Sequence, residues 1–438
     1  MAPLYNTLKI KHGKCPPDCT LCEEACVEAR KGRGITALHI PAVNFYGAMT
    51  CNQCSEPECQ AVCPVGAIDK SQGDGVVRIN QDKCIGCGLC TLACPYDSIY
   101  YNPETHKSFK CDMCDGKPKC VEACPYDVLS YIKNSPIEGY LQEKDLLVPG
   151  TTLCLGCPAE LALRFTLRVF GRNTIVFTAP GCIATTLMGL NTKVGTYIAC
   201  SSTLLTNVAS VMGGVRRYYQ HIGREVNLVA FVGDGATADV GFQSLSGAAE
   251  RGENIVYICY DNEGYMNTGI QRSGTTPLRA WTTTSPVGKI AQGKEQPGKN
   301  MPLIMLWHGL SYVATASIAY LEDYAQKLKK AMQVKDGMAY IHLYSPCPTG
   351  WRTPQDSAIQ ISRLAVETNY FPLWEAESGK IHITQEVTNP RPISELTKLM
   401  GKFSHLNEEE LGEFQQLVNS NFATIKNLAW LADHDQPQ

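Results

Sequence analysis

Twenty-two cysteines in 438 residues constrain this chain more than any other feature of its sequence. Sixteen of them fall between Cys15 and Cys124 and form four sets of four. A segment this dense in cysteine and this poor in apolar periodicity must be organised by whatever groups its thiols hold. The four sets are Cys15, Cys19, Cys22, Cys26; Cys51, Cys54, Cys59, Cys63; Cys84, Cys87, Cys90, Cys94; and Cys111, Cys114, Cys120, Cys124.

The spacing within the sets indicates iron–sulfur clusters. The third set reads C-x2-C-x2-C-x3-C-P, the bacterial ferredoxin pattern, and the second and fourth sets also end in C-x3-C-P. Zinc ribbons and disulfides are the alternatives, although zinc sites generally use two C-x2-C knuckles and rarely a proline-terminated fourth cysteine. The first set departs from the pattern, because three residues separate Cys15 from Cys19 and Val27 replaces proline. The sequence therefore predicts four [4Fe–4S] clusters, the first on the weakest pattern.

The composition excludes several other classes of protein. Apolar residues make up 44% of the chain, enough for a sizeable core, and the formal charge of −3 gives no reason to expect a nucleic-acid partner. No apolar run approaches the roughly 18–20 residues that a membrane span needs. The opening Met-Ala-Pro-Leu-Tyr-Asn lacks the layout of a signal peptide. We therefore expect a cytoplasmic protein without a transmembrane segment.

The residue pattern of the sequence changes after the cysteine array. We expect a small, cluster-organised ferredoxin-like α+β domain at residues 1–135 with short hairpins such as Gly75–Asn80, and a turn-rich linker at 136–150. Continuous apolar runs then predict buried parallel strands, and helical patterns lie between them. The expected architecture is an α/β domain at 151–400 followed by a helical tail at 401–438, in which Asn407–Asp433 forms one long helix or a helix pair. The expected strands are Thr174–Thr178, Val226–Val232, Ile255–Tyr260 and Ala339–Tyr344, and the expected helices are Ser201–Gln220, Ala236–Arg251 and Tyr320–Val334.

Two of the predicted strands end in a diphosphate-binding motif. Ligands in open α/β sheets bind at the carboxyl ends of strands, where glycine lets the backbone approach a phosphate. A carboxylate, an amide oxygen and a backbone carbonyl form an oxygen-only set that suits Mg²⁺ bridging a diphosphate. A GDG triplet with an asparagine-containing turn at the end of the next strand is the thiamine diphosphate signature. A calcium loop or a plain turn is the alternative, and the absence of G-x-G-x-x-G after any predicted strand argues against a nicotinamide or flavin site. The residues concerned are Gly233, Asp234 and Gly235, then Asn262 and Gly264.

The four ordered sets resemble the polyferredoxin electron-transfer subunits of molybdoenzymes and hydrogenases. The resemblance implies crosswise pairing, first set with fourth and second with third. One cluster would then use Cys15, Cys19, Cys22 and Cys124, and another Cys26, Cys111, Cys114 and Cys120. The inner pair would use Cys51, Cys54, Cys59 and Cys94, and Cys63, Cys84, Cys87 and Cys90.

From Leu153 to about His405 the chain resembles the thiamine-binding β subunit of the 2-oxoacid:ferredoxin (acceptor) oxidoreductases, typified by pyruvate:ferredoxin oxidoreductase. The motifs concerned are CLGC, APGC, VGDGATADVG, YDNEGYMNTGIQRSGTTP, SPCPTGWR and ISRLAVETNYFPLWE. The resemblance implies that Cys154, Cys157, Cys182 and Cys347 hold a proximal [4Fe–4S] cluster beside the thiamine, which brings the total to five. It implies that Asn267 contacts the substrate adduct and that Thr268 lies over the diphosphate, with Gln271, Arg272 and Ser273 as further candidate contacts. Cys200, which we expect to open a helix, and Cys259, inside a buried strand, match no ligand position and are interpreted as packing residues.

The resemblance also implies the reaction and the partners. A catalytic β subunit of this family takes part in thiamine diphosphate-dependent, coenzyme A-linked oxidative decarboxylation of a 2-oxoacid to acyl-CoA and carbon dioxide. Pyruvate and phenylglyoxylate are the candidate substrates, and the electrons would pass through the clusters to ferredoxin or to a flavin subunit that reduces NAD. The activating glutamate belongs to an α subunit, and a γ subunit completes the assembly. An electron-transfer subunit whose α/β half is a non-catalytic docking module is the alternative, and a non-oxidative decarboxylase with structural clusters is a further one.

Overall fold

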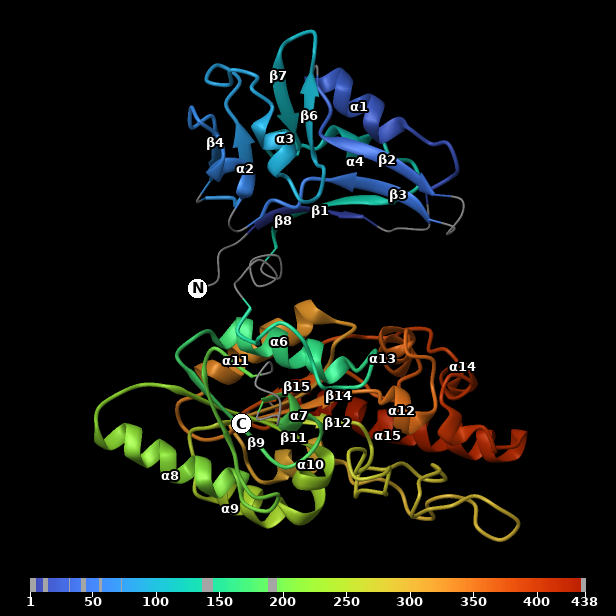
Figure 1. Cartoon of the computed structure of the whole chain (residues 1–438). Helices are drawn as coiled ribbons and strands as arrows, with labels where there is room; N and C mark the ends of the chain where they lie inside the picture. Colours follow the sequence, from blue (N-terminus) through green and yellow to red (C-terminus); the bar gives the residue numbers. More distant parts are fainter. Residues whose placement is uncertain are drawn as a thin grey trace. The chain divides into compact units, whose positions relative to one another are not determined.

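The chain forms two compact units, Met1–Lys144 and Asp145–Gln438 (Figure 1). The computed structural model describes residues 5–10, 15–30, 32–40, 45–54, 57–71, 73–135, 145–187 and 195–434. The division falls within the predicted linker, of which residues 136–144 lie outside the described part. Across these described ranges, no helix is both long and apolar enough to cross a membrane.

The described residues of the first unit form four two-stranded antiparallel ribbons joined by short helices (Figure 1). Its buried hydrophobic clusters combine apolar side chains with the cysteines themselves, as expected of a unit organised by its thiols. The predicted hairpin at Gly75–Asn80 lies on the second strand of one such ribbon. The paired strands are β1 (Tyr5–Ile10) with β8 (Leu129–Ser135), β2 (Ile35–Ile40) with β3 (Phe45–Thr50), β4 (Ile68–Lys70) with β5 (Val77–Ile79), and β6 (Ile99–Asn102) with β7 (Lys107–Lys110). The helices are α1 (Leu21–Arg30), α2 (Glu58–Ala61), α3 (Leu89–Ala93), η2 (Met113–Gly116) and α4 (Lys119–Glu122).

The second unit is built on an eight-stranded sheet. The first six strands across it are parallel, and the last two pair antiparallel at one edge. The three strands β12, β14 and β13 are buried along their whole length, as expected of parallel strands covered on both faces. The order across the sheet is β10 (Ala199–Ser202), β9 (Thr174–Thr178), β11 (Asn227–Gly233), β12 (Val256–Asp261), β14 (Ala339–Tyr344), β13 (Tyr312–Ser317), β15 (Trp374–Glu377) and β16 (Lys380–Ile383).

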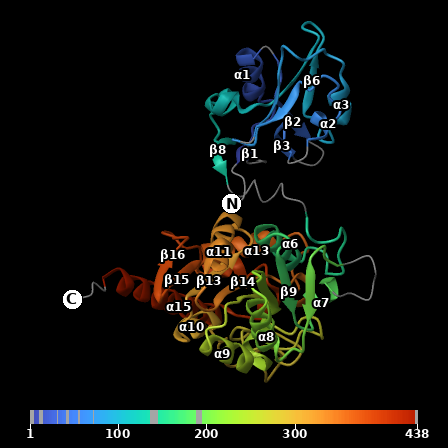
Figure 2. The same ribbon diagram turned by 90° about the vertical axis from the view of Figure 1, so that its left-hand side faces the viewer.

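Helices cover both faces of this sheet. Figure 2 shows α6, α11 and α13 on one side and α8, α9 and α10 on the other. The helices are α6 (Pro158–Phe170), α7 (Cys182–Leu187), α8 (Val208–His221), η3 (Gly235–Val240, a π-helix), α9 (Phe242–Glu250), α10 (Met301–Trp307), α11 (Leu321–Gln333), α12 (Pro348–Trp351), α13 (Ala358–Glu367), α14 (Ile393–Thr397), η4 (Gly401–Phe403) and α15 (Glu408–His434).

Most of the predicted elements are confirmed, within one or two residues at their ends. The helix predicted at Ser201–Gln220 is wrong in its first part. Residues Ala199–Ser202 form strand β10, which gains backbone hydrogen bonds from β9, and α8 begins only at Val208. Cys200 therefore lies in an edge strand and does not open a helix. The long helix predicted near the end is the single helix α15, whose buried Phe414, Val418 and Ile425 pack it into the same compact unit as the sheet.

Candidate functional site

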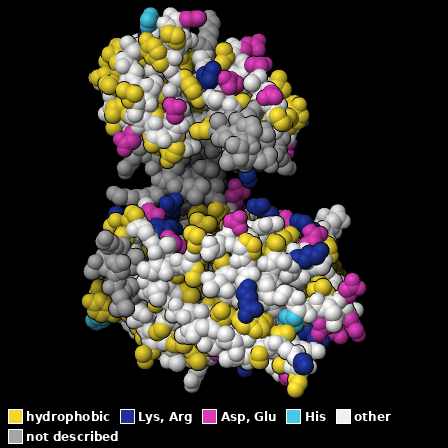
Figure 3. All heavy atoms as spheres, turned by 45° about the vertical axis from the view of Figure 1, so that its right-hand side comes forward, with side chains coloured by type: hydrophobic (Ala, Val, Ile, Leu, Met, Phe, Trp, Pro, Cys, Tyr) yellow, Lys and Arg dark blue, Asp and Glu magenta, His cyan; other side chains and the backbone are white. Residues whose placement is uncertain are grey.

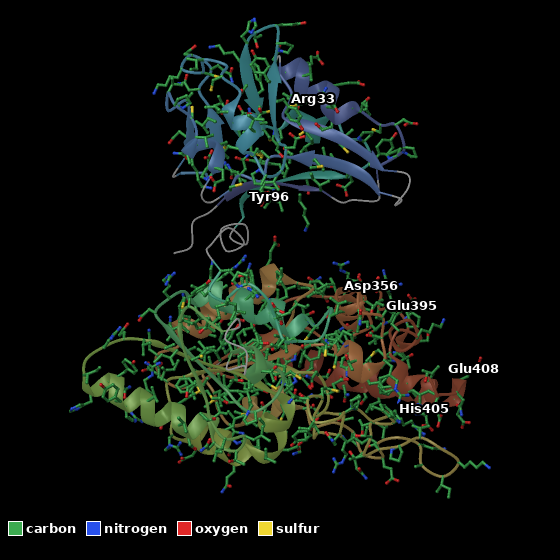
Figure 4. The ribbon with its side chains drawn as sticks, viewed as in Figure 1. Arg33, Tyr96, Asp356, Glu395, His405 and Glu408 are labelled. Atoms are coloured by element: carbon green, nitrogen blue, oxygen red, sulfur yellow. The ribbon has the colours of Figure 1, made fainter. Side chains whose placement is uncertain are left out.

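The cysteines of the first unit gather in groups that mix the sequence sets. One cavity is lined by all of Cys51, Cys54, Cys59 and Cys94, the last of which comes from a different set than the other three. Tyr96, labelled in Figure 4, lines the same cavity. Because four thiols around one cavity are what a [4Fe–4S] cluster requires, this grouping matches the crosswise pairing of the second and third sets.

Thiols that lie near one another also shift one another's pKa values, since the effect of one charge on another falls with distance. Burial raises the pKa of Cys15, and the thiols of Cys19 and Cys124 raise it further. Burial likewise raises the pKa of Cys120 to about 12, and the thiols of Cys111, Cys26 and Cys114, together with that of Cys22 from the first group, add to that shift.

The fourth group comprises Cys63, Cys84, Cys87 and Cys90. Burial raises the pKa of Cys90, and the thiols of Cys84 and Cys87 contribute to the increase. Cys63 packs in the same hydrophobic cluster as Cys90. Within the described ranges, no group of three or more His, Cys, Asp or Glu side chains lies close enough to hold a single metal ion.

A common turn follows the Cys-Pro dipeptides. The third residue after the cysteine has a left-handed backbone in each case, at Gly66, Asp97 and Asp127, with φ of 57°, 46° and 52°. Glycine and aspartate are residues that tolerate this conformation. The turn lets the next backbone N–H point back at the sulfur, since Ala67 donates to Cys63 Sγ at 3.2 Å and Ser98 to Cys94 Sγ at 3.4 Å. Such hydrogen bonds stabilise the thiolate form that binds iron.

In the second unit, the predicted ligands of both cofactors lie at one edge of the sheet. Four adjacent parallel strands, β9, β11, β12 and β14, end at this edge, and a predicted ligand follows each of them. Asp234 follows β11 and Asn262 follows β12, so the two strands in the middle present the cation ligands. Cys182 follows β9 and Cys347 follows β14, so the two flanking strands present cluster cysteines.

The four cysteines of the predicted proximal cluster act on one another electrostatically. Burial raises the pKa of Cys182 to about 12, and the thiols of Cys347, Cys157 and Cys154 and the carboxylate of Asp234 raise it further. Burial raises the pKa of Cys347 to about 11, with Cys157 and Cys154 again contributing. These thiols resist ionisation because they are buried close to one another. Bound iron would balance the charge of their thiolate forms, so these side chains fit a cluster.

The C-x-G-C loops of the two units share a backbone geometry. Gly156 precedes Cys157 with φ of 75°, and Gly86 precedes Cys87 with φ of 69°. A Cβ atom at Gly156 would lie 1.8 Å from the carbonyl oxygen of Gln355, and one at Gly86 would lie 1.9 Å from that of His106. Each loop therefore requires glycine for two reasons: its backbone is left-handed, and a neighbouring carbonyl leaves no room for a Cβ atom.

The cation ligands predicted from the sequence converge. One terminal atom of the Asn262 side-chain amide lies 3.0 Å from Oδ1 of Asp234 and 2.8 Å from the carbonyl oxygen of Gly264. With its nitrogen at that position, the amide donates to both oxygens. With its oxygen there, three oxygens face one another, which is the arrangement that Mg²⁺ requires. Rotation of a single amide thus fits these residues to a cation.

A buried hydrogen-bond network surrounds Asp234. Burial raises the pKa of Asp234 well above its ordinary range, and the neighbouring carboxylate of Asp261 raises it further. Burial also disfavours the ionised form of Asp261, but hydrogen bonds from His342 (2.9 Å), the backbone of Glu263 (2.8 Å) and Thr275 (2.8 Å) keep its pKa below the ordinary value. Asp261 is therefore stabilised as an anion by the protein, whereas a bound cation would satisfy Asp234.

A cavity of about 140 Å³ joins these residues. Its wall includes Gly233, Asp234, Gly235, Asn262, Gly264, Asn267 and Thr268, which are all the residues predicted for the thiamine site, together with Cys182. At Gly235 a Cβ atom would lie 2.3 Å from the Tyr265 ring, so glycine allows the ring to close this side of the cavity. A larger cavity of about 440 Å³ lies at the amino ends of β11 and β12 and contains none of the predicted ligands.

Several neighbours of this cavity were not identified from the sequence. Thr275 has its hydroxyl 3.0 Å from Asp234 and 2.8 Å from Asp261, and His342 reaches Asp261 from β14. The only available signal for Thr275 was its place in the quoted SGTTP run. Of the three further candidates, Ser273 is buried close to Thr275 (3.1 Å), Gln271 is hydrogen-bonded to Thr268, and Arg272 is exposed.

The remaining two cysteines lie away from these groups. Cys259 is fully buried within β12, as predicted for a packing residue. The Cys200 thiol lies 3.8 Å from the carbonyl oxygen of Leu187, which it can reach as a weak donor.

Comparison with protein families divides the chain in the same way. Residues 181–343 match the thiamine pyrophosphate enzyme, C-terminal TPP binding domain, and residues 42–134 match the 4Fe-4S dicluster domain.

Individual relatives differ in how much of the chain they match. The β subunit of the NADH-dependent phenylglyoxylate dehydrogenase of Aromatoleum evansii is 43% identical over 440 residues, which cover 98% of this chain and 98% of that protein. Pyruvate synthase subunit PorB of Methanothermobacter marburgensis is 47% identical over 281 residues, 64% of this chain and 97% of its own length. Ketoisovalerate oxidoreductase subunit VorB of Pyrococcus horikoshii is 43% identical over 288 residues, 64% of this chain and 92% of its own length.

Proposed function

The chain belongs to the β subunits of the 2-oxoacid oxidoreductases, and from this we propose the roles of its residues, its substrate and its partners. Members of this family oxidise 2-oxoacids with thiamine diphosphate and iron–sulfur clusters, and this chain contains a domain for each cofactor. The observation that supports a catalytic role best is the oxygen set of Asp234, Asn262 and Gly264 beside Cys182. A docking module without catalysis would have no need of that set.

The thiamine site is proposed to work through charge and backbone shape. Asp234, the Asn262 amide oxygen and the Gly264 carbonyl oxygen would hold Mg²⁺, which would neutralise the charge of a diphosphate. Gly233 and Gly235 would let the backbone approach the phosphate oxygens, Thr268 would contact the diphosphate, and Asn267 would contact the substrate. When bound, thiamine diphosphate supplies a nucleophilic carbon that adds to the carbonyl of the 2-oxoacid and keeps the electron pair left by departing carbon dioxide.

The cysteines are proposed to hold five [4Fe–4S] clusters, which accept and pass on electrons one at a time. The proximal cluster is bound by Cys154, Cys157, Cys182 and Cys347, and the other four follow the crosswise pairing. Cys182 and Asp234 line the same cavity, which supports direct electron transfer from the thiamine site to the proximal cluster.

The two exposed ligand cysteines are Cys87 and Cys154. Ile85, Leu89 and Leu92 around Cys87 are also exposed, and Figure 3 shows hydrophobic side chains over much of the visible face of this unit. The array is therefore proposed to exchange electrons with its partner near Cys87.

Partner subunits are proposed to complete the active site. Among the described residues that line the thiamine cavity, Asp234 is the only carboxylate, and its role is to bind the cation. The glutamate that activates the aminopyrimidine is therefore assigned to an α subunit, and a γ subunit is expected in the same assembly. Coenzyme A takes the acyl group, and ferredoxin or a flavin subunit that reduces NAD takes the electrons.

Phenylglyoxylate is the proposed substrate. The phenylglyoxylate dehydrogenase β subunit matches both units over 98% of the chain, whereas the pyruvate synthase subunit matches 64%. The identity to the pyruvate synthase subunit is slightly higher over the part that matches, at 47% against 43%, so pyruvate is the second candidate. Turnover of the purified complex with phenylglyoxylate, pyruvate and 2-oxoisovalerate, each with coenzyme A, tests this choice. A kcat/KM for pyruvate tenfold above that for phenylglyoxylate would reverse it.

Metal analysis of the same complex tests the cofactor assignment. Twenty ligand cysteines, four for each cluster, predict about 20 iron and about 20 sulfide per chain, after correction for clusters in partner subunits. Thiamine diphosphate and magnesium are expected at one per chain. Bound zinc with almost no iron would contradict the assignment.

A further inference from the structure

Three lysines of the first unit donate hydrogen bonds to the backbone carbonyls of predicted cluster cysteines. The ammonium group of Lys70 lies 2.7 Å from the carbonyl oxygen of Cys54, and that of Lys110 lies 2.8 Å from the carbonyl oxygen of Cys111. Lys107 donates in the same way to Cys84. The three cysteines belong to three different clusters in the crosswise pairing, so each of these clusters has an ammonium group beside its ligand loop.

Lys110 is the most deeply buried of the three, with 6% of its surface exposed. It ends strand β7 directly before Cys111, and among the described residues its ammonium contacts only neutral oxygens: those of Cys111 at 2.8 Å, the Gln53 side chain at 3.4 Å and the Val77 backbone. No carboxylate in this part of the chain forms an ion pair with it. Its positive charge is therefore neither cancelled by a partner nor screened by water.

The position of Lys110 places it beside the ligand loops of two predicted clusters. It directly precedes Cys111 and donates to the carbonyl oxygen of Cys111 at 2.8 Å. It also donates to the side chain of Gln53 at 3.4 Å, and Gln53 lies between Cys51 and Cys54 of the other cluster.

Gln53 links the same two clusters by hydrogen bonds. It is 2% exposed and lies between Cys51 and Cys54 in the sequence. Its side-chain nitrogen donates to the carbonyl oxygen of Cys111 at 3.0 Å, and its side-chain oxygen accepts from the backbone of Val77 at 2.8 Å and from Lys110. Its own carbonyl oxygen accepts from Lys70 at 3.0 Å. A buried polar bridge therefore runs from one cysteine group to the other.

A cluster becomes more negative when it accepts an electron, so a buried positive charge nearby stabilises the reduced form and raises the reduction potential. We propose that Lys110 is a redox-tuning residue shared by the cluster of Cys51, Cys54, Cys59 and Cys94 and the cluster of Cys26, Cys111, Cys114 and Cys120. Lys110 would raise the reduction potentials of both clusters above the values they would have without its charge. The inference rests on the proposed assignment of the cysteines to [4Fe–4S] clusters.

The test compares Lys110→Met and Lys110→Gln in the assembled complex, with a redox titration followed by electron paramagnetic resonance. Both variants remove the charge, and the glutamine amide can still donate to the Cys111 carbonyl. Lys119→Met is the matched control, because Lys119 precedes Cys120 of the same cluster but is half exposed and paired with Glu122 at 2.6 Å. Lys110→Arg retains the charge and serves as the second control.

We expect wild-type iron content in all four variants. In Lys110→Met and Lys110→Gln, the reduction potentials of two clusters should each fall by about 59 mV. For a one-electron step, this corresponds to an about tenfold lower ratio of reduced to oxidised cluster at a given potential. Lys119→Met and Lys110→Arg should leave the titration close to wild type.

Two results would overturn the inference: unshifted potentials in Lys110→Met and Lys110→Gln with clusters intact, or an equal shift in Lys119→Met. Loss of iron in both neutral variants would make Lys110 a structural residue and would overturn it too. Wild-type complex without the expected iron would instead refute the cluster assignment itself, so the two failures can be distinguished.

Discussion

Substitution of Gly86 by alanine should remove one cluster, whereas the same change at Gly88, two residues away, should not. Both glycines lie in the loop of Cys84, Cys87 and Cys90, and both have left-handed backbones, with φ of 69° and 73°. Alanine costs about 1–2 kcal/mol in that conformation, and this cost is common to both variants.

The difference lies in the neighbours. A Cβ atom at Gly86 would lie 1.9 Å from the His106 carbonyl oxygen, and real Cβ atoms essentially never come closer than 3.0 Å to a neighbour, so the loop must move by about 1.1 Å. At Gly88 nothing lies within 4 Å. A forced displacement of packed backbone costs about 1–3 kcal/mol more, for a total of about 2–5 kcal/mol at Gly86.

Iron and sulfide analysis of the purified complexes measures the outcome, with the spin count of the fully reduced samples as a second readout. Gly86→Ala should lose about four iron per chain, the content of one cluster, and Gly88→Ala should match the wild type. Full iron content in Gly86→Ala would refute the reasoning, because the carbonyl contact would then be no constraint on the loop. Equal losses in both variants would also refute it, since backbone conformation alone would explain them.

Three further predictions concern the second unit. Asp234→Ala should lose magnesium and thiamine diphosphate together, while its iron content stays at the wild-type level. Mass spectrometry and metal analysis measure these contents, and full retention of thiamine diphosphate would show that the site lies elsewhere. Cys347→Ser should abolish reduction of the proximal cluster by the 2-oxoacid. Cys111→Ser should leave that reduction intact in a single turnover but stop electron delivery to the external acceptor. Undiminished electron delivery in Cys111→Ser would exclude the array as the exit path. Lys327→Met should lower the free energy of unfolding of the second unit by about 3–5 kcal/mol, as measured by denaturant unfolding. The reason is that buried Lys327 donates to Asp323 (2.6 Å), the Thr315 carbonyl (2.9 Å) and Thr384 (2.8 Å). A decrease below about 1 kcal/mol would contradict this.

The sequence was most informative where a local pattern determines an element. The strands predicted at Thr174–Thr178 and Ala339–Tyr344 match β9 and β14, and those predicted from continuous apolar runs match β11 and β12 within one residue. Because parallel strands end at one edge of a sheet, the strand prediction also places Asp234 and Asn262 side by side. Cys200 shows the limit of such reasoning. Its short strand exists through pairing with β9, and no local periodicity predicts an edge strand of four residues.

Contacts between distant parts of the chain could not be predicted in this way. Thr275 joins Asp234 to Asp261 only because a long segment after β12 folds back over the carboxyl ends of the strands. Lys110 resembles any other lysine at the end of a short strand until the structure shows its burial against Gln53. A single sequence has no signal for such pairs, since each residue type is ordinary in its own segment.

A buried ion pair lies between the two predicted cofactor sites. Lys402, 2% exposed, pairs with Glu263, which lies between the proposed cation ligands Asn262 and Gly264. The same ammonium lies 3.5 Å from the centre of the Trp351 ring, and the Trp351 indole donates to the carbonyl oxygen of Asn262 at 2.8 Å. Trp351 ends the short helix that begins directly after Cys347.

The loop with the proposed cation ligands and the loop with Cys347, a proposed cluster ligand, are thus joined through Lys402 and Trp351. A buried ion pair adds little net stability, because desolvation offsets its attraction, but it requires one specific geometry. Lys402 therefore contributes to the relative placement of these two loops more than to the stability of the unit.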